Sequence, residues 1–237
     1  YAYGDPMDQV AKEYPKVQFV RIDGGPSSVT NVAVMDFAEQ EGSFLVGAAA
    51  AMKSKTKHVG FIGGNESAVI NKFAAGFAQG AKAVDPAIVV DDKRLASGDE
   101  GKGFGDTQGA KVAASAMYQN GADIVFTAAG GSFAGSFPAA KDAGKMVIGV
   151  DSDQYNTVSD ASWKPLILTS MVKRVDNAVF LSIQNFKTNG KLASHSFNLK
   201  DDGVGYSTSG GQVDDIKSKL EDFKAQIISG KIVVNAK

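Results

Sequence analysis

The side chains that most often carry enzyme chemistry are scarce in this chain. Its 237 residues include two histidines and no cysteine. The missing thiol excludes disulfides, thiolate metal sites and cysteine nucleophiles. His58 and His195 form neither an HxxxH nor an HExxH pair, which is the helical spacing that binds zinc. His58 lies at the edge of a predicted strand, where an exposed structural role is expected. We therefore predict no metal site.

Glycine-rich and acidic segments offer no catalytic alternative. The stretch from Gly98 to Gly103 resembles a phosphate-binding loop, but Ala96 occupies its first glycine position and Gly103 the position of the magnesium ligand. No GxSxG nucleophile elbow occurs. We predict no catalytic residue and no cofactor. Three pairs of adjacent acids are typical of solvated turns or helix starts, because neighbouring side chains point apart: Asp91-Asp92, Asp201-Asp202 and Asp214-Asp215.

Three loops that directly follow predicted strands could instead bind a ligand. Open α/β sheets bind ligands at the carboxyl ends of their strands. Gly130 and Gly131 let a ligand approach the backbone, and Ser132 can cap the next helix. Asp151 ends another strand, where a carboxylate can accept hydrogen bonds from a sugar diol. In the third loop Lys173 borders an apolar helix. Simple turns, helix caps and a solvated helix start remain alternatives for all three.

The elements that would position these loops alternate between strand and helix. Short apolar runs rich in β-branched residues indicate strands, and apolar residues at helical spacing indicate helices. This alternation predicts a doubly wound α/β fold with parallel sheets. Strands are expected at Val17–Ile22, His58–Ile62, Ile88–Val90, Asp123–Thr127, Met146–Val150 and Leu166–Met171. Helices are expected at Pro6–Glu13, Glu41–Lys53, Ser67–Val84, Thr107–Asn120, Ser132–Ala143, Val175–Thr188 and Val213–Ser229.

The bulk composition fits a folded chain without a nucleic-acid partner. Apolar residues make up 43% of the chain and the formal net charge is −1. Phosphate binding needs clustered basic residues in excess, so nucleic acid is not expected as a partner. No apolar run approaches the roughly 20 residues of a membrane-spanning helix. The opening segment Tyr1–Pro6 resembles a loop at a strand end, so we expect a strand and helix to precede it in the natural gene product.

A series of motifs runs along the chain in a fixed order: Asn31–Val34, Glu39–Gly47, Val59–Gly64, Lys72–Phe77, Gly121–Phe126, Ala128–Gly131, Ile148–Gln154, Leu168–Asp176 and Asp202–Tyr206. In this order they resemble the Bmp/PnrA-like (basic membrane protein) family, whose members are substrate-binding lipoproteins of ABC importers. The resemblance covers essentially the whole chain.

The resemblance implies the type I periplasmic-binding-protein fold, in which two doubly wound lobes close on a ligand. Residues 1–57 and 168–195 would form the first lobe, which would lack its N-terminal strands. Residues 58–167 and 196–237 would form the second lobe. The chain would cross between the lobes near Lys57, Leu168 and Phe197.

The resemblance also implies a purine nucleoside as the ligand, bound in the cleft between the lobes. Phe104 matches the aromatic residue that stacks on the base, although Gly103 replaces a serine of the family motif and the preceding loop is longer. Asp151 and Lys173 match the pair that holds the ribose hydroxyls, and Gly130 matches a backbone contact.

On the facing lobe, Tyr3 and Asp5 match a loop at the cleft edge. The implied partners are the permease subunits of an ABC importer, and the implied location is outside the cytoplasmic membrane. There the protein would be attached only through an N-terminal lipid anchor absent from this chain. A monomer is expected.

A free sugar, a pyrimidine nucleoside or a nucleotide derivative remains an alternative ligand. An enzyme acting on nucleosides, with a nucleophile or base near Asp151, is the alternative of a different class.

Overall fold

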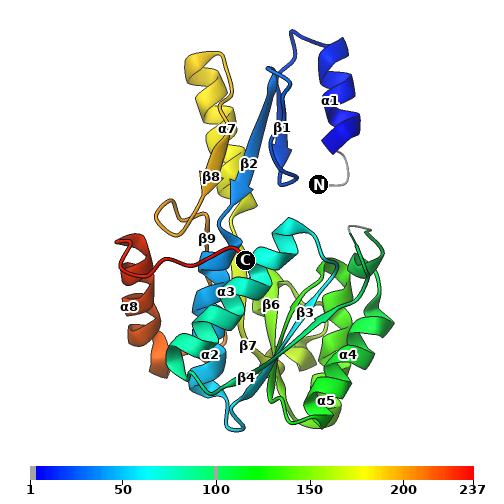
Figure 1. Ribbon diagram of the computed structural model, residues 1–237, viewed down its shortest axis with the longest axis vertical. Helices are drawn as coiled ribbons and strands as arrows, with labels where there is room; N and C mark the ends of the chain where they lie inside the picture. Colours follow the sequence, from blue (N-terminus) through cyan, green and yellow to red (C-terminus); the bar gives the residue numbers. More distant parts are fainter. Residues whose placement is uncertain (1–3, 99–100) are drawn as a thin grey trace. The chain divides into compact units, whose positions relative to one another are not determined.

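The computed structural model describes residues 4–98 and 101–237 (Figure 1). The chain forms two compact units. Unit 1 contains the described residues up to Ala38 together with Arg174–Val204, and unit 2 contains Glu39–Lys173 and Gly205–Lys237. The chain therefore passes between the units three times, after Ala38, Lys173 and Val204.

Unit 1 is built on a parallel sheet. Its described strands lie in the order β1-β2-β8, and both neighbouring pairs are parallel. The buried amide of Asn31 ties the end of the first helix to the start of β1, because its Nδ2 lies 3.0 Å from the carbonyl oxygen of Ala11 and 2.8 Å from that of Val17. The elements of unit 1 are α1 (Gly4–Glu13), β1 (Phe19–Ile22), β2 (Val32–Phe37), α7 (Val175–Asn189) and β8 (His195–Phe197).

Unit 2 contains the larger sheet. Its described strands lie in the order β4-β3-β5-β6-β7-β9, and the pairs from β4 to β7 are parallel. Nearly continuous burial of β3 and β5 explains their mostly apolar sequences, and β7 is buried along most of its length as well. The strands are β3 (His58–Gly63), β4 (Val89–Arg94), β5 (Ile124–Ala128), β6 (Met146–Asp151), β7 (Ile167–Lys173) and β9 (Val204–Tyr206).

Helices cover both faces of this sheet (Figure 1). α2 and α3 pack together on one face, where the rings of Phe61, Phe77 and Phe126 meet. α4 and α5 pack together on the other face, over a core that includes Met117 and Phe137. The helices are α2 (Glu39–Lys53), α3 (Ala68–Val84), α4 (Thr107–Gln119), α5 (Ser136–Ala143), the short α6 (Gln154–Thr157) and α8 (Lys217–Ile228). None of the helices in the described part of the chain has the length and hydropathy that crossing a bilayer requires.

The contact between α2 and α3 is unusually close because glycines line it. A Cβ added to Gly76 would overlap the carbonyl oxygen of Gln40, and one added to Gly80 would overlap that of Phe44. Gly47 faces the backbone of Phe77 in the same way. The two helices therefore touch backbone to backbone.

The predicted doubly wound α/β fold is confirmed, and every predicted strand and helix is found within a few residues of its expected bounds. Two regions differ. β4 continues through the charged residues Asp91–Arg94, and the segment from Ser132 begins as a 3₁₀ turn before α5 starts at Ser136. The strands β2, β8 and β9 were not predicted.

The division into units differs from the predicted lobe boundaries. Residues 39–57 were expected in the first lobe, but α2 packs on α3 and therefore belongs to unit 2. Residues 168–173 also belong to unit 2, since β7 pairs with β6 from Ile167 to Val172. Residues 196–204 lie in unit 1, where Phe197 pairs with Phe37 of β2. The crossings lie after Ala38, Lys173 and Val204 rather than near Lys57, Leu168 and Phe197.

We expect Gly80→Ala to lower the free energy of unfolding by about 1–3 kcal/mol, because the added methyl group forces α2 and α3 apart. Alanine's better helix propensity opposes this loss but does not cancel it. Urea denaturation followed by circular dichroism measures the change. Gly205→Ala is the control, because its Cβ would meet no atom within 4 Å. An unchanged midpoint for Gly80→Ala would contradict the close contact.

Candidate functional site

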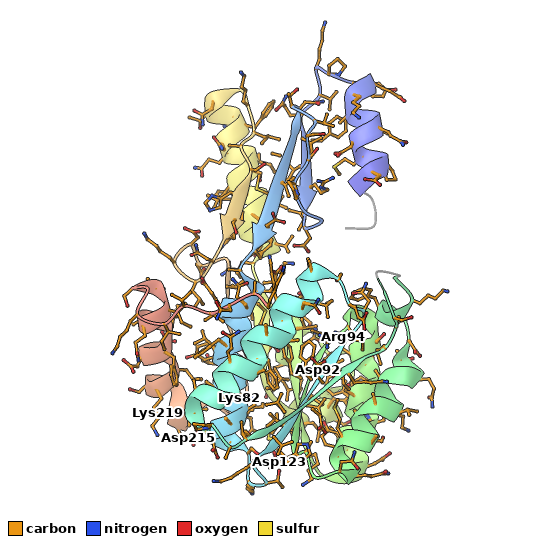
Figure 2. The ribbon with its side chains drawn as sticks, viewed as in Figure 1. Lys82, Asp92, Arg94, Asp123, Asp215 and Lys219 are labelled. Atoms are coloured by element: carbon orange, nitrogen blue, oxygen red, sulfur yellow. The ribbon has the colours of Figure 1, made fainter. Side chains whose placement is uncertain are left out.

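Parallel strands bring the loops predicted to bind a ligand to one edge of the unit 2 sheet. β3, β5, β6 and β7 run in the same direction, so their carboxyl ends lie together. Figure 2 shows the two edges, with Arg94 at the end of β4 and Asp123 at the start of β5. The edge marked by Arg94 is the carboxyl edge. Four of the predicted site residues, Phe104, Gly130, Asp151 and Lys173, follow or end elements at this edge.

The opposite edge has a structural role. The buried carboxylate of Asp123 accepts hydrogen bonds from the turn after α2: Ser54 Oγ lies at 2.7 Å and the backbone N of Lys55 at 2.6 Å. His58 starts β3 at this edge, and its Nε2 lies 2.9 Å from Oδ2 of Asp91. The exposed role expected for His58 is corrected here, since its side chain is only 15% exposed.

Phe104 and Gly130 lie together at the carboxyl edge. Phe104 ends a short 3₁₀ turn (η1, Gly101–Phe104), and its ring lies over Gly64 at the end of β3. A Cβ on Gly64 would come within 2.6 Å of the ring, and one on Gly130 would come within 3.5 Å of the Phe104 Cβ. The Phe104 side chain is partly exposed. The glycines therefore make the room that this aromatic residue occupies.

The loop that carries Phe104 is fixed to its neighbours. Ser132 Oγ donates a hydrogen bond to the carbonyl oxygen of Gly103 at 2.8 Å. Gly103 also passes so close to the Gly64 carbonyl that any side chain there would overlap it. This explains the glycine at the position where the family motif has serine. On the other side of Phe104, the Asp106 carboxylate accepts from the backbone N of Gly109 at 2.8 Å and caps α4.

Asp151 ends β6 in a backbone conformation that is uncommon for a residue other than glycine. Its φ angle is +65° and its side chain is exposed. Strained backbone of this kind is concentrated at functional sites. The following turn is held by Gln154, whose backbone N lies 3.0 Å from Ser170 Oγ and whose Nε2 lies 3.2 Å from the Val150 carbonyl oxygen.

Asp151 and Lys173 lie on neighbouring strands. The register pairs Asp151 with Val172, the residue before Lys173. Lys173 is buried, and its ammonium Nζ lies 2.9 Å from Oε1 of Glu39 at the start of α2. The other oxygen of Glu39 lies 3.1 Å from Nζ of Lys72. The Glu39 side chain is 0% exposed, so two lysines share a fully buried carboxylate beside the predicted site.

The prediction from sequence missed Glu39. Its segment was recognised as a motif, but an acid at a helix start is usually solvated. The only signal was the long apolar run that follows it in α2, which indicates a helix with little solvent-facing surface.

Two further site residues, Tyr3 and Asp5, were predicted on the facing lobe. Asp5 lies in unit 1, in the first turn of α1, and its side chain is exposed. Asp5 therefore lies within a helix, where a loop was expected. Tyr3 lies outside the described residues. Nowhere in the described part of the chain do three histidine or acidic side chains gather in a way that could hold a metal ion.

Solved structures identify the class of protein. A crystal structure of ABC transporter system solute-binding proteins from Aeropyrum pernix K1 matches this chain with a TM-score of 0.78 and 25% sequence identity. The match covers 100% of this chain and 76% of the other. The fold is the type I periplasmic-binding-protein fold, which is the fold of a class of solute-binding proteins.

The family follows from the sequence comparisons. The family described as "ABC transporter substrate-binding protein PnrA-like" matches residues 1–237. The CD4+ T-cell-stimulating antigen of Listeria monocytogenes is 34% identical over 100% of this chain and 69% of its own length. The ABC transporter nucleoside-binding protein BmpA of Lactococcus lactis is 35% identical over 100% of this chain and 70% of its own. This chain belongs to the PnrA-like family of ABC transporter substrate-binding proteins.

Membership defines the general role. The family consists of substrate-binding proteins rather than enzymes. Such proteins bind a small ligand outside the cytoplasm and deliver it to the permease of an ABC importer.

We expect Ser132→Ala to loosen the loop that carries Phe104, because the hydrogen bond to the Gly103 carbonyl is lost. Amide hydrogen exchange in residues 101–105 should become faster. Ser136→Ala is the matched control, since it removes a 2.8 Å hydrogen bond to Thr127 from an equally buried hydroxyl nearby. Both variants should lose about 1 kcal/mol of stability. Equal exchange of residues 101–105 in the two variants would show that Ser132 does not hold this loop.

Proposed function

We propose that this protein binds a purine nucleoside at the carboxyl edge of the unit 2 sheet and delivers it to an ABC permease. The observation that carries the proposal is the placement of Phe104. Its partly exposed ring lies over Gly64, which follows β3, and beside Gly130, which follows β5. Asp151 ends β6, the neighbour of β5, at the same edge of the sheet. An aromatic ring and a carboxylate at one sheet edge match the two ends of a nucleoside.

The base is recognised by stacking on Phe104. Stacking of a base on an aromatic side chain contributes about 1–3 kcal/mol. The nearby Gly130 has a φ angle of +51° and no side chain, so its backbone can approach the ligand. A sugar without a base would make no use of this stacking.

The ribose is recognised by Asp151 and Lys173. An ionised carboxylate accepts hydrogen bonds from two neighbouring hydroxyls, and an ammonium donates to hydroxyl oxygens. The strand register brings these two residues to adjacent positions of β6 and β7. The name of the Lactococcus lactis relative, a nucleoside-binding protein, supports a ligand of this class. The proposal also includes attachment to the cell membrane through an N-terminal lipid, and a monomeric state.

Calorimetric titration with inosine, guanosine, adenosine, cytidine and ribose tests the proposal. We expect binding of the purine nucleosides and no detectable binding of ribose alone. Phe104→Ala should weaken inosine binding about tenfold to one-hundredfold, which corresponds to the loss of one stacking contact. Asp151→Ala should also abolish the preference for nucleosides over free purine bases, because the contacts to the sugar are lost.

Two exposed residues provide matched controls. Phe180→Ala removes a 65% exposed aromatic side chain from α7, and Asp142→Ala removes a 74% exposed carboxylate from α5. Neither should change the affinity for inosine. Binding of ribose with the same affinity as inosine would replace the nucleoside by a sugar as the ligand. Chromatography of inosine after prolonged incubation should show no free base, and its release would mean an enzyme.

A further inference from the structure

The starting observation is the buried cluster formed by Glu39, Lys72 and Lys173. The carboxylate of Glu39 is fully buried and lies 2.9 Å from the Lys173 ammonium and 3.1 Å from the Lys72 ammonium. The side chain of Lys173 is 5% exposed and that of Lys72 is 26% exposed. Three charged side chains from α2, α3 and β7 thus meet at the carboxyl edge of the sheet.

Burial of these charges costs free energy, and a role beyond stabilising the fold would account for it. Burial removes three charges from water, and the attraction between them often fails to repay that loss. The cluster carries one carboxylate and two ammonium groups. A packed apolar core at this position would avoid the cost of burying them.

The geometry constrains Lys173 more than the other members. A free lysine side chain has four rotatable bonds, and fixing it costs up to about 2 kcal/mol of conformational entropy. The contact with Glu39 fixes the ammonium before any ligand arrives. Ligand binding therefore does not have to overcome this loss of conformational entropy. Because the ammonium lies 2.9 Å from Oε1 of Glu39, this ion pair restricts the positions that the ammonium can take.

We infer that Glu39 is a positioning residue. It holds the Lys173 ammonium in the orientation that donates hydrogen bonds to the hydroxyl oxygens of the ligand. This inference rests on the proposed function, because Lys173 is the residue assigned to the ribose. Glu39 acts only through Lys173. Lys72 supplies the second charge that keeps the Glu39 carboxylate in place.

Glu39→Gln and Glu39→Asp test the inference by inosine titration. The first variant removes the negative charge. The second keeps the charge, but its side chain is one methylene group shorter, so the carboxylate lies farther from the lysines. Both should weaken inosine binding about tenfold, the effect of one hydrogen bond to a charged group. Lys53→Met is the matched control, because Lys53 ends the same helix and forms a 2.9 Å ion pair with Asp215 away from the site. It should bind inosine like the parent protein.

A double-mutant cycle with Lys173→Met separates positioning from structural damage. If Glu39 acts through Lys173, Glu39→Gln should cause no further loss of affinity in the Lys173→Met background. An equal loss in both backgrounds, or an unchanged affinity in both Glu39 variants, would overturn the inference. If Glu39→Gln fails to fold, Glu39→Asp still tests the inference, because the aspartate retains a negative charge for both lysines.

A readout without ligand keeps this inference separate from the proposed function. Acetylation of individual lysines with acetic anhydride, followed by mass spectrometry, reports how firmly each amine is held. Lys173 should react several times faster in both Glu39 variants than in the parent, while the 42% exposed Lys111 should react equally. If no nucleoside binds but Lys173 reacts faster, the proposed function fails and the positioning by Glu39 stands. If Lys173 reacts equally in all three proteins, the positioning fails.

Discussion

The direct contact between the backbones of α2 and α3 is the constraint on which the candidate site depends. Helices normally pack with their axes 8–10 Å apart because side chains separate them. Here Gly76 and Gly80 meet carbonyl oxygens of α2, and Gly47 meets the backbone of α3. This contact makes α2 part of unit 2, although its first residue directly follows the crossing after Ala38. Glu39 thereby becomes buried between two helices and β7.

The parallel sheet brings the packed residues and the strand ends to the same edge. Since β3, β5, β6 and β7 share one direction, the helix starts and the strand ends alternate along a single edge. Glu39 at the start of α2 is thus brought to Lys173 at the end of β7. Phe104 reaches the same edge by a different route, because its loop is held by Ser132 and fits only over glycines. Rigid strands place the polar groups, and a loop fixed at both ends places the aromatic ring.

Much of the fold could be predicted because its strands carry strong local signals. The buried runs of β3, β5 and β6 are mostly apolar and contain several β-branched residues, so their positions followed from the sequence. β8 has three residues and an exposed start, which leaves no periodic pattern to detect. The charged half of β4 was missed for another reason. As an edge strand, it is half exposed, and charged residues suit an edge.

The lobe boundaries could not be predicted because they depend on contacts between distant residues. The sequence of α2 is apolar on most sides, and it would suit either unit. Its contacts with α3, β7 and α8 place it in unit 2. The glycines that allow the closest of these contacts do not reveal from sequence which element they meet. The site residues Phe104, Gly130, Asp151 and Lys173 were expected from the family resemblance. Their arrangement at one edge of the sheet followed from strand order.

Glu39 shows why a resemblance between sequences predicts ligand contacts more readily than the residues that support them. A residue that touches a ligand belongs to a motif with a known chemical role, whereas a supporting residue is defined by what surrounds it. The acids at the start of α2 differ in burial: Glu39 is fully buried, and Glu41 is partly exposed. Their sequence context is nearly the same, so only the packing of α2 against α3 and β7 separates them. The charge that orients Lys173 is therefore a consequence of the fold. The same glycines that bring the helices together determine which carboxylate faces the lysine.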